Sequence, residues 1–208
     1  MKQHLGSLLE EIQELEKRVV EKIHHTTDEL SYEIKDGKAV FALEVLRRHK
    51  ALVMRIWRYL GESSFLAVLT APVIYSILIP TLLLDLLVSL YQWICFPIYR
   101  IPRVRRREFV VMDRHRLGYL NYIEKINCVY CGYVNGVFAF VREVGSRTEQ
   151  YWCPIKHARR VKGCHARQCI FCEYGDAEGF RSDFDELRQQ FTDIKSSIGK
   201  RPPKAKSP

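Results

Sequence analysis

The stretch from Ser63 to Tyr99 is almost entirely apolar, and it limits the possible folds of this chain more than any other feature. As one straight helix it would extend about 55 Å, whereas the hydrocarbon core of a bilayer is about 30 Å thick. The stretch therefore predicts a membrane segment in one of two arrangements. One is a single span from about Phe65 to Leu84 followed by an interfacial helix, and the other is a re-entrant hairpin that turns near Pro80.

Charges on either side of this stretch favour the hairpin. Basic residues are dense before it, at 47–58, and after it, at 100–116. Because basic residues near a membrane segment prefer the cytoplasmic face, a segment that enters and returns on the same side satisfies both groups. We therefore expect both termini to be cytoplasmic.

Asp85 is the one carboxylate within the apolar stretch. A carboxylate at membrane depth is costly enough to suggest a functional role, although the cost disappears if the span ends at Leu84 and Asp85 lies among the headgroups.

The net positive charge of the chain lies entirely in its second half. Residues 1–62 carry 11 Lys and Arg against 11 Asp and Glu, whereas residues 100–208 carry 22 against 12. Five arginines follow the apolar stretch directly and are predicted to contact anionic lipid headgroups: Arg100, Arg103, Arg105, Arg106 and Arg107. A nucleic-acid partner is disfavoured, because no nucleic-acid-binding signature accompanies these arginines.

The N-terminal arm has the pattern of two helices separated at Gly37. Apolar residues from Leu5 to Ile23 recur at steps of three and four, as in a short coiled coil or helical hairpin. A second stretch, 39–60, combines an apolar face with arginines and lysines, as in a basic amphipathic helix at a bilayer surface. The two helices offer a surface for a protein partner or for self-association.

Six of the seven cysteines lie between positions 128 and 172 and suggest a metal site. The first pair, with a following glycine, has the spacing of a zinc knuckle, and a Cys-x3-His motif follows 21 residues later. The preferred zinc ligands are Cys128, Cys131, Cys153 and His157. An alternative set for zinc or a rubredoxin-like iron is Cys128, Cys131, Cys169 and Cys172. A third possibility is a second ion, with Cys164 and His165 joining the last pair.

Redox chemistry is the main alternative to a metal. Cys128 and Cys131 have the spacing of a thiol oxidoreductase dithiol, but the alternating strands and helices that usually carry such a motif are missing. The sequence also lacks a P-loop, GxGxxG, GxSxG and HExxH. These absences weigh against an enzyme.

The stretches Asn127-Cys-Val-Tyr-Cys-Gly-Tyr-Val-Asn-Gly136 and Tyr151-Trp-Cys-Pro-Ile-Lys-His-Ala158 resemble a group of uncharacterised bacterial membrane-associated proteins. The resemblance runs from the apolar segment to about Tyr174, which is roughly half of the sequence. It implies a bacterial inner-membrane location, and it places Cys128, Cys131, Cys153 and His157 in the recurring core of the group. It implies no activity.

The sequence as a whole predicts a mainly α-helical, membrane-inserted chain. Its predicted regions are an N-terminal helical arm (1–62), a membrane segment (63–99), a basic, cysteine-rich metal-binding module (100–175), an amphipathic helix (176–199) and a disordered tail (200–208). The function predicted from these regions is a membrane-anchored, zinc-binding scaffold or regulatory protein. The alternatives are a thiol oxidoreductase using Cys128 and Cys131, or an iron electron-transfer protein.

Overall fold

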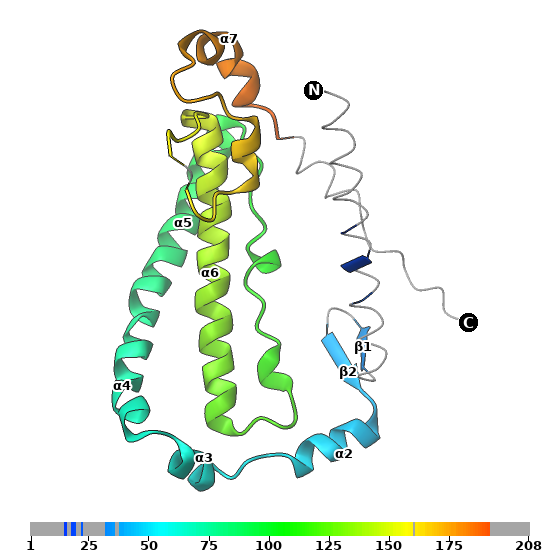
Figure 1. The fold of residues 1–208 in the computed structure, drawn as a ribbon. Helices are drawn as coiled ribbons and strands as arrows, with labels where there is room; N and C mark the ends of the chain where they lie inside the picture. The colour runs from blue at the N-terminus through cyan, green and yellow to red at the C-terminus, as the bar shows by residue number, and fades with distance from the viewer. Residues whose placement is uncertain are drawn as a thin grey trace, which may run out of the picture. The chain divides into compact units, whose positions relative to one another are not determined.

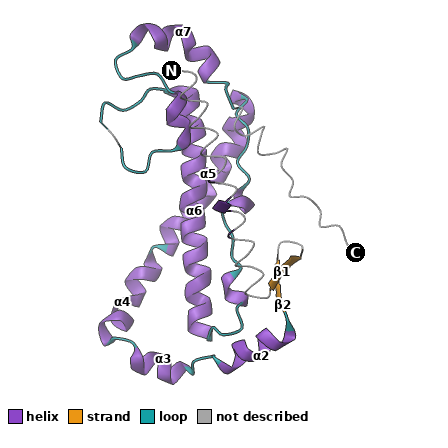
Figure 2. Ribbon diagram, turned by 45° about the vertical axis from the view of Figure 1, so that its right-hand side comes forward, coloured by secondary structure: helices purple, strands orange, loops and turns teal. Residues whose placement is uncertain are grey.

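The computed structural model of the chain describes Leu15, Arg18, Val19, Lys22 and residues 32–35, 38–159 and 161–191. Helices dominate these residues, and one short strand pair is the only sheet among them (Figures 1 and 2). The predicted mainly α-helical class is therefore confirmed. The chain divides into two compact units, Met1–Ser63 with Asp113–Asn127, and Ser64–Met112 with Cys128–Pro208.

The first unit contains a β-hairpin where the sequence predicted the start of a helix. Strands β1 (Tyr32–Lys35) and β2 (Lys38–Phe41) pair antiparallel, and they are followed by α2 (Leu43–Ala51) and α3 (Ile56–Glu62). The prediction of one helix over 39–60 is wrong: Asp-Gly between the two strands is a strong hairpin signal, and β1 alternates apolar and polar residues. Most of the predicted coiled coil, from Leu5 to Ile23, lies outside the described residues.

The apolar stretch forms two consecutive helices with no reversal between them. Helix α4 (Phe65–Ser76) is separated from α5 (Leu78–Tyr99) only by Ile77, whose carbonyl accepts a hydrogen bond from the Thr81 amide of α5. The predicted hairpin near Pro80 is therefore wrong. Pro80 occupies the first turn of α5, where a proline without an N–H group is tolerated. Together the two helices are long and apolar enough to cross a membrane.

After α5 the chain reverses and runs back along the same helix. Arg100 adopts a left-handed conformation with φ of 57°. Residues 101–112, here named the return segment, then follow without helix or strand apart from one short 3-10 turn, η1 (Arg106–Glu108). Another 3-10 turn, η2 (Arg114–Arg116), precedes α6 (Tyr122–Trp152), the longest described helix.

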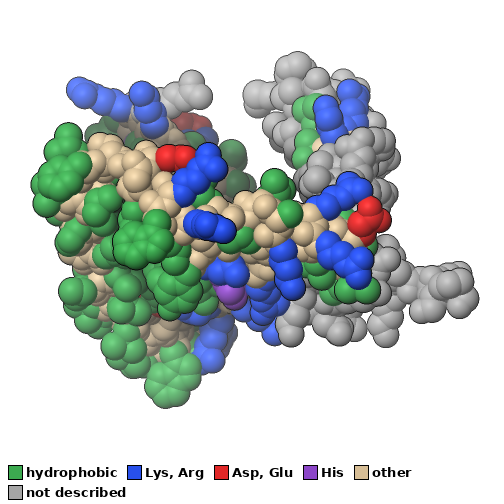
Figure 3. Space-filling view, turned by 90° about the horizontal axis from the view of Figure 1, so that it is seen from below, with side chains coloured by type: hydrophobic (Ala, Val, Ile, Leu, Met, Phe, Trp, Pro, Cys, Tyr) green, Lys and Arg blue, Asp and Glu red, His purple; other side chains and the backbone are tan. Residues whose placement is uncertain are grey.

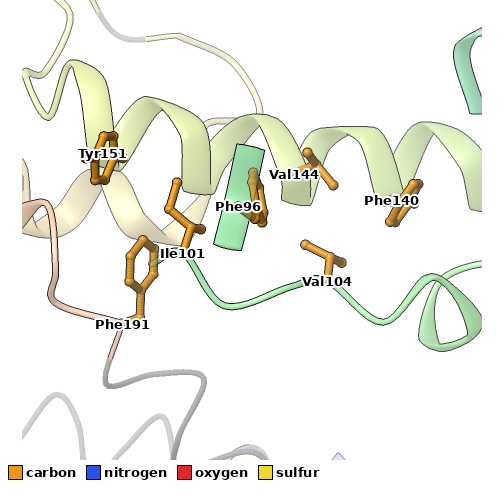
Figure 4. Close-up of a cluster of buried hydrophobic side chains, with 7 residues drawn as sticks. All are labelled: Phe96, Ile101, Val104, Phe140, Val144, Tyr151 and Phe191. Carbon is orange, nitrogen blue, oxygen red and sulfur yellow. The ribbon is translucent and has the colours of Figure 1, made fainter. Parts of the chain in front are cut away.

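The second unit has its own hydrophobic core, built from four parts of the chain. Side chains from α5, the return segment, α6 and the residues after the last helix meet in one cluster (Figure 4): Phe96, Ile101, Val104, Phe140, Val144, Tyr151 and Phe191. This cluster holds the return segment against both α5 and α6. It also fixes which face of α5 is turned inward.

Beyond α6 the chain forms a cysteine-containing loop with the 3-10 helix η3 (Ala166–Ile170), and then α7 (Ala177–Leu187). The side chain of Asp176 caps α7 by accepting a hydrogen bond of 2.9 Å from the Gly179 amide. The Gln150 amide group ties the end of α7 to α6 by donating to the carbonyls of Leu187 and Gln190. The predicted amphipathic helix over 176–199 is thus present from 177 to 187, and positions 192–208 lie outside the described residues.

Candidate functional site

Helix α5 carries polar side chains on its inner face and apolar side chains on its outer face. Thr81, Asp85 and Gln92 are buried, with relative exposures of 2%, 8% and 8%. Helix α4 has no buried residue and extends this exposed apolar surface, and the exposed apolar surface of both helices is here named the outer face. Sixteen large apolar side chains on it are each at least 45% exposed: Phe65, Leu66, Val68, Leu69, Val73, Ile74, Ile77, Ile79, Leu82, Leu83, Leu86, Leu87, Leu90, Trp93, Ile94 and Ile98. Hydrophobic side chains gather in a broad patch in the space-filling view (Figure 3). This distribution is the reverse of that of a helix packed in a water-soluble protein.

Asp85 is held by groups from the return segment and from α6. The Arg106 guanidinium donates through Nε to Oδ1 at 2.9 Å and through Nη2 to Oδ2 at 2.6 Å. The Tyr133 hydroxyl donates to Oδ2 at 2.8 Å, and Ser89 approaches Oδ1 at 3.5 Å. The carboxylate is thereby compensated by a bidentate ion pair and a phenol, as the burial of a charge requires.

The two partners of Asp85 are also in contact with each other. The Arg106 guanidinium lies 5.9 Å from the centroid of the Tyr133 ring, which is within the range of a cation–π interaction. Burial, and then the hydrogen bond to Asp85, raise the pKa of the Tyr133 phenol. The hydrogen bond to Asp85 raises the pKa of Arg106 as well. Both shifts favour the protonated forms, in which the two groups donate to the Asp85 carboxylate.

A second set of polar contacts attaches the return segment to α5 and α6. The Gln92 side chain accepts from the Val104 amide at 3.1 Å and donates to the Val104 carbonyl at 3.4 Å. On the other side, the Arg147 guanidinium of α6 donates to the Pro102 carbonyl at 2.6 Å. These bonds satisfy backbone groups that an extended segment cannot pair with itself.

The structure separates the five arginines that were predicted to contact lipid headgroups. Arg106 is used in the ion pair with Asp85, Arg105 pairs with Glu108 at 3.4 Å, and Arg103 donates to the Trp93 carbonyl at 3.0 Å. Within the described part of the chain, the exposed side chains of Arg100 and Arg107 have no hydrogen bond or ion pair. Arg106 is therefore withdrawn from the predicted headgroup set.

The first cysteine pair lies inside α6, not in a knuckle. Cys128 is half-buried and Cys131 is exposed, and the helix continues past both of them to Trp152. Since a helix rises about 1.5 Å per residue, Cys131 and Cys153 are separated by about 32 Å. Cys172 lies near Cys153, because its amide donates to the Pro154 carbonyl at 2.9 Å. In this structure, neither quartet that includes Cys128 and Cys131 can surround one ion.

The later candidate ligands lie in the loop that follows α6. Cys153, His157, Cys164 and Cys169 are exposed, while His165 and Cys172 are half-buried. The His165 Nε2 atom is 2.7 Å from the Glu149 carboxylate of α6. Among the described residues, no three His, Cys, Asp or Glu side chains converge in a way that could hold a metal ion.

Contacts to α6 fix part of this loop. Arg142 donates to the carbonyls of Gly163 and Cys164, and Arg167 pairs with Glu143. Burial raises the pKa of the Cys172 thiol, and the charges of Asp183 and Asp176 raise it further. Cys172 therefore has less thiolate character than an ordinary cysteine at neutral pH.

The dithiol alternative gains no support from this geometry. Thiol oxidoreductases activate a cysteine at a helix N-terminus, where free N–H groups stabilise the thiolate. Helix α6 begins at Tyr122, more than one turn before Cys128. A redox role for Cys128 and Cys131 stays a prediction.

Comparison with protein-family models, with curated proteins and with solved structures finds no match to this chain.

Three residues of the polar cluster were not recognised as a site from the sequence. Tyr133 and Gln92 had no distinguishing motif, and Arg106 was grouped with its neighbours as a headgroup ligand. One signal was present, because a lone carboxylate in an apolar stretch needs a cation, and the nearest cations are the arginines that follow that stretch. The sequence alone does not say which of them reaches Asp85.

Proposed function

We propose that the chain is a membrane-anchored scaffold or regulatory protein of the bacterial inner membrane, with cytoplasmic termini and with α4 and α5 as its anchor. The observation that carries the proposal is the outer face of these helices, on which apolar side chains are exposed from Phe65 to Ile98. Water-soluble monomers rarely expose a continuous apolar patch of more than a few hundred Å². Contact with lipid explains why the side chains on this face are apolar and exposed. The opposite face of α5 carries the buried polar side chains that bind the return segment and α6.

The arrangement of the polar groups supports a scaffold rather than an enzyme. Asp85, Arg106 and Tyr133 bind one another, and Gln92 binds backbone. These contacts hold the return segment and α6 against the anchor. Helix α6 then acts as a stem that carries the cysteine-containing loop, and the N-terminal arm (1–62) supplies the partner surface.

Zinc remains part of the proposal, with the loop after α6 as its location. The support is the density of candidate ligands in this one segment: Cys153, His157, Cys164, His165, Cys169 and Cys172. Elemental analysis of the purified full chain tests it, using a Cys169→Ser/Cys172→Ser variant and, as a matched control, Cys128→Ser/Cys131→Ser. We expect stoichiometric zinc that is lost only in the first variant. Zinc lost only in the control would place the site in α6, and absence of zinc would refute the metal.

Membrane fractionation tests the anchor. The chain should sediment with membranes and resist extraction by alkaline carbonate. Replacing two outer-face residues, Leu82→Glu and Leu86→Glu, should release it, because charges on this face oppose burial in lipid. Val161→Glu changes an exposed residue of the loop after α6 and is the matched control. Wild-type protein found in the soluble fraction would refute the anchor.

A further inference from the structure

Helices α5 and α6 run in the same direction, which restricts how the protein can meet a bilayer. The Tyr130 hydroxyl of α6 donates to the Ile74 carbonyl of α4 at 2.6 Å. Further along, the Tyr133 hydroxyl donates to Asp85 of α5 at 2.8 Å, and the Tyr91 hydroxyl of α5 is 3.1 Å from Thr148 Oγ1. Contacts therefore advance along both helices together, as the ribbons also show (Figures 1 and 2). For both helices to cross a membrane in the same direction, the chain between them would have to cross back.

The return segment cannot make that crossing. Apart from the short turn η1 its backbone is irregular, and in hydrocarbon only helices and closed barrels satisfy their own backbone groups. It also carries exposed charges at Arg103, Arg105, Arg107 and Glu108. Because these side chains are not enclosed, the segment must lie outside the hydrocarbon.

A span by α4 and α5 alone meets the same obstacle. Leu82 is the midpoint of the Phe65–Tyr99 stretch, and Arg106 binds Asp85 only three residues beyond it. A perpendicular helix would thus carry the charges of the return segment near the bilayer centre. The part of the stretch before the contact at Ile74 is nine residues or about 14 Å long, less than half of the hydrocarbon core.

We propose that α4 and α5 lie in the plane of a single anionic leaflet instead of crossing it. This proposal rests on the membrane anchor proposed above and specifies its orientation. The outer face enters the acyl chains, while α6 and the return segment remain on the aqueous side. Arg103, bonded to the backbone at Trp93, and the uncommitted Arg107 contact the phosphates, since guanidinium groups bind phosphate oxygens strongly. Trp93, which is 63% exposed, lies at the interface.

Depth measurements in vesicles test this orientation. The full chain is reconstituted into vesicles of phosphatidylcholine and phosphatidylglycerol, with one tryptophan at position 69, 82 or 93 and the other tryptophans replaced by phenylalanine. Quenching by lipids brominated at different depths reports the position of each tryptophan. We expect one shared, shallow depth for all three. A Leu82→Trp variant at the bilayer centre, with positions 69 and 93 toward opposite surfaces, would overturn the proposal.

Lipid charge gives a second, independent measurement. Flotation with anionic vesicles should exceed flotation with phosphatidylcholine alone, and Arg107→Gln should weaken anionic binding about fivefold. Lys162→Gln, at an exposed site in the loop after α6, should leave binding unchanged. Equal binding to both vesicles would overturn the headgroup contact. Failure to associate with any vesicle would refute the anchor itself, and not merely its orientation.

Discussion

Replacing Arg106 by glutamine should destabilise the second unit more than replacing its partner Asp85 by asparagine. The side chain of Asp85 is 11% exposed and that of Arg106 is 41% exposed. Arg106→Gln therefore leaves a carboxylate charge buried with Tyr133 and a long contact to Ser89. Asp85→Asn leaves a guanidinium that can turn toward solvent, and the new amide still accepts from Tyr133.

The exposed fractions of the two side chains determine how much each substitution should lower the free energy of unfolding. Removing one partner of a buried ion pair lowers the free energy of unfolding by about 3–5 kcal/mol. Because Arg106 is partly exposed, Arg106→Gln should lower it by about 2–3 kcal/mol. Asp85→Asn loses charge-assisted hydrogen bonds without stranding a charge, so its cost is about 1 kcal/mol. The double variant should cost little more than Asp85→Asn. The resulting coupling energy is about 2–3 kcal/mol in magnitude.

Equilibrium unfolding of the full chain in mixed micelles measures these values. Trp93 and Trp152 both belong to the second unit and report on it once Trp57 is replaced by phenylalanine. Arg107→Gln is the matched control, and it should change the free energy of unfolding by less than about 0.5 kcal/mol. If Arg106→Gln costs no more than Asp85→Asn, or if the two costs add, the ion pair does not hold this unit together.

Three further outcomes are expected. Gln92→Leu should cost about 2 kcal/mol, because it leaves the buried N–H and C=O of Val104 unpaired, and hydrogen exchange at the Val104 amide should accelerate; unchanged exchange would contradict the bond. Gly136→Ala should destabilise the second unit by about 1–3 kcal/mol, because the new Cβ would lie 2.8 Å from the backbone of the return segment. Gly145→Ala, whose Cβ would meet nothing within 4 Å, should stabilise it by about 0.5–1 kcal/mol in the same unfolding assay. Equal effects of the two substitutions would mean that the close approach at Gly136 is absent. Alkylation of Cys172 by iodoacetamide should have its pH midpoint above that of a free cysteine, because burial raises its pKa, and mass spectrometry after a pH series that finds a lower midpoint would refute this.

The misplaced turn at Pro80 shows where reasoning from flanking charges failed. Basic residues on both sides of the apolar stretch indicated a return to the same membrane side, and the structure shows a reversal of chain direction. The chain reverses at Arg100, after the apolar residues, and the return segment then runs back along α5. Charge position alone does not distinguish a turn within the apolar stretch from a turn after it.

The structure holds the cysteines of each predicted quartet apart for a related reason. The spacing between Cys131 and Cys153 is compatible with a loop that brings them together and with a helix that holds them apart. The intervening residues continue the apolar face that packs α6 onto Phe96 and Val104, and this packing favours the straight helix. Ligand spacing describes short-range geometry only, so it carries no information about a spacer of that length.

The sequence by itself determined the helical class, the apolar stretch and the need of Asp85 for a compensating partner, because these follow from composition and local periodicity. Only the tertiary structure decided that Arg106 and Tyr133 are the partners of Asp85, and that Cys128 and Cys131 lie far from Cys153. Those relations depend on where the chain reverses and on which faces of α5 and α6 are buried together. Both are properties of packing between segments distant in sequence.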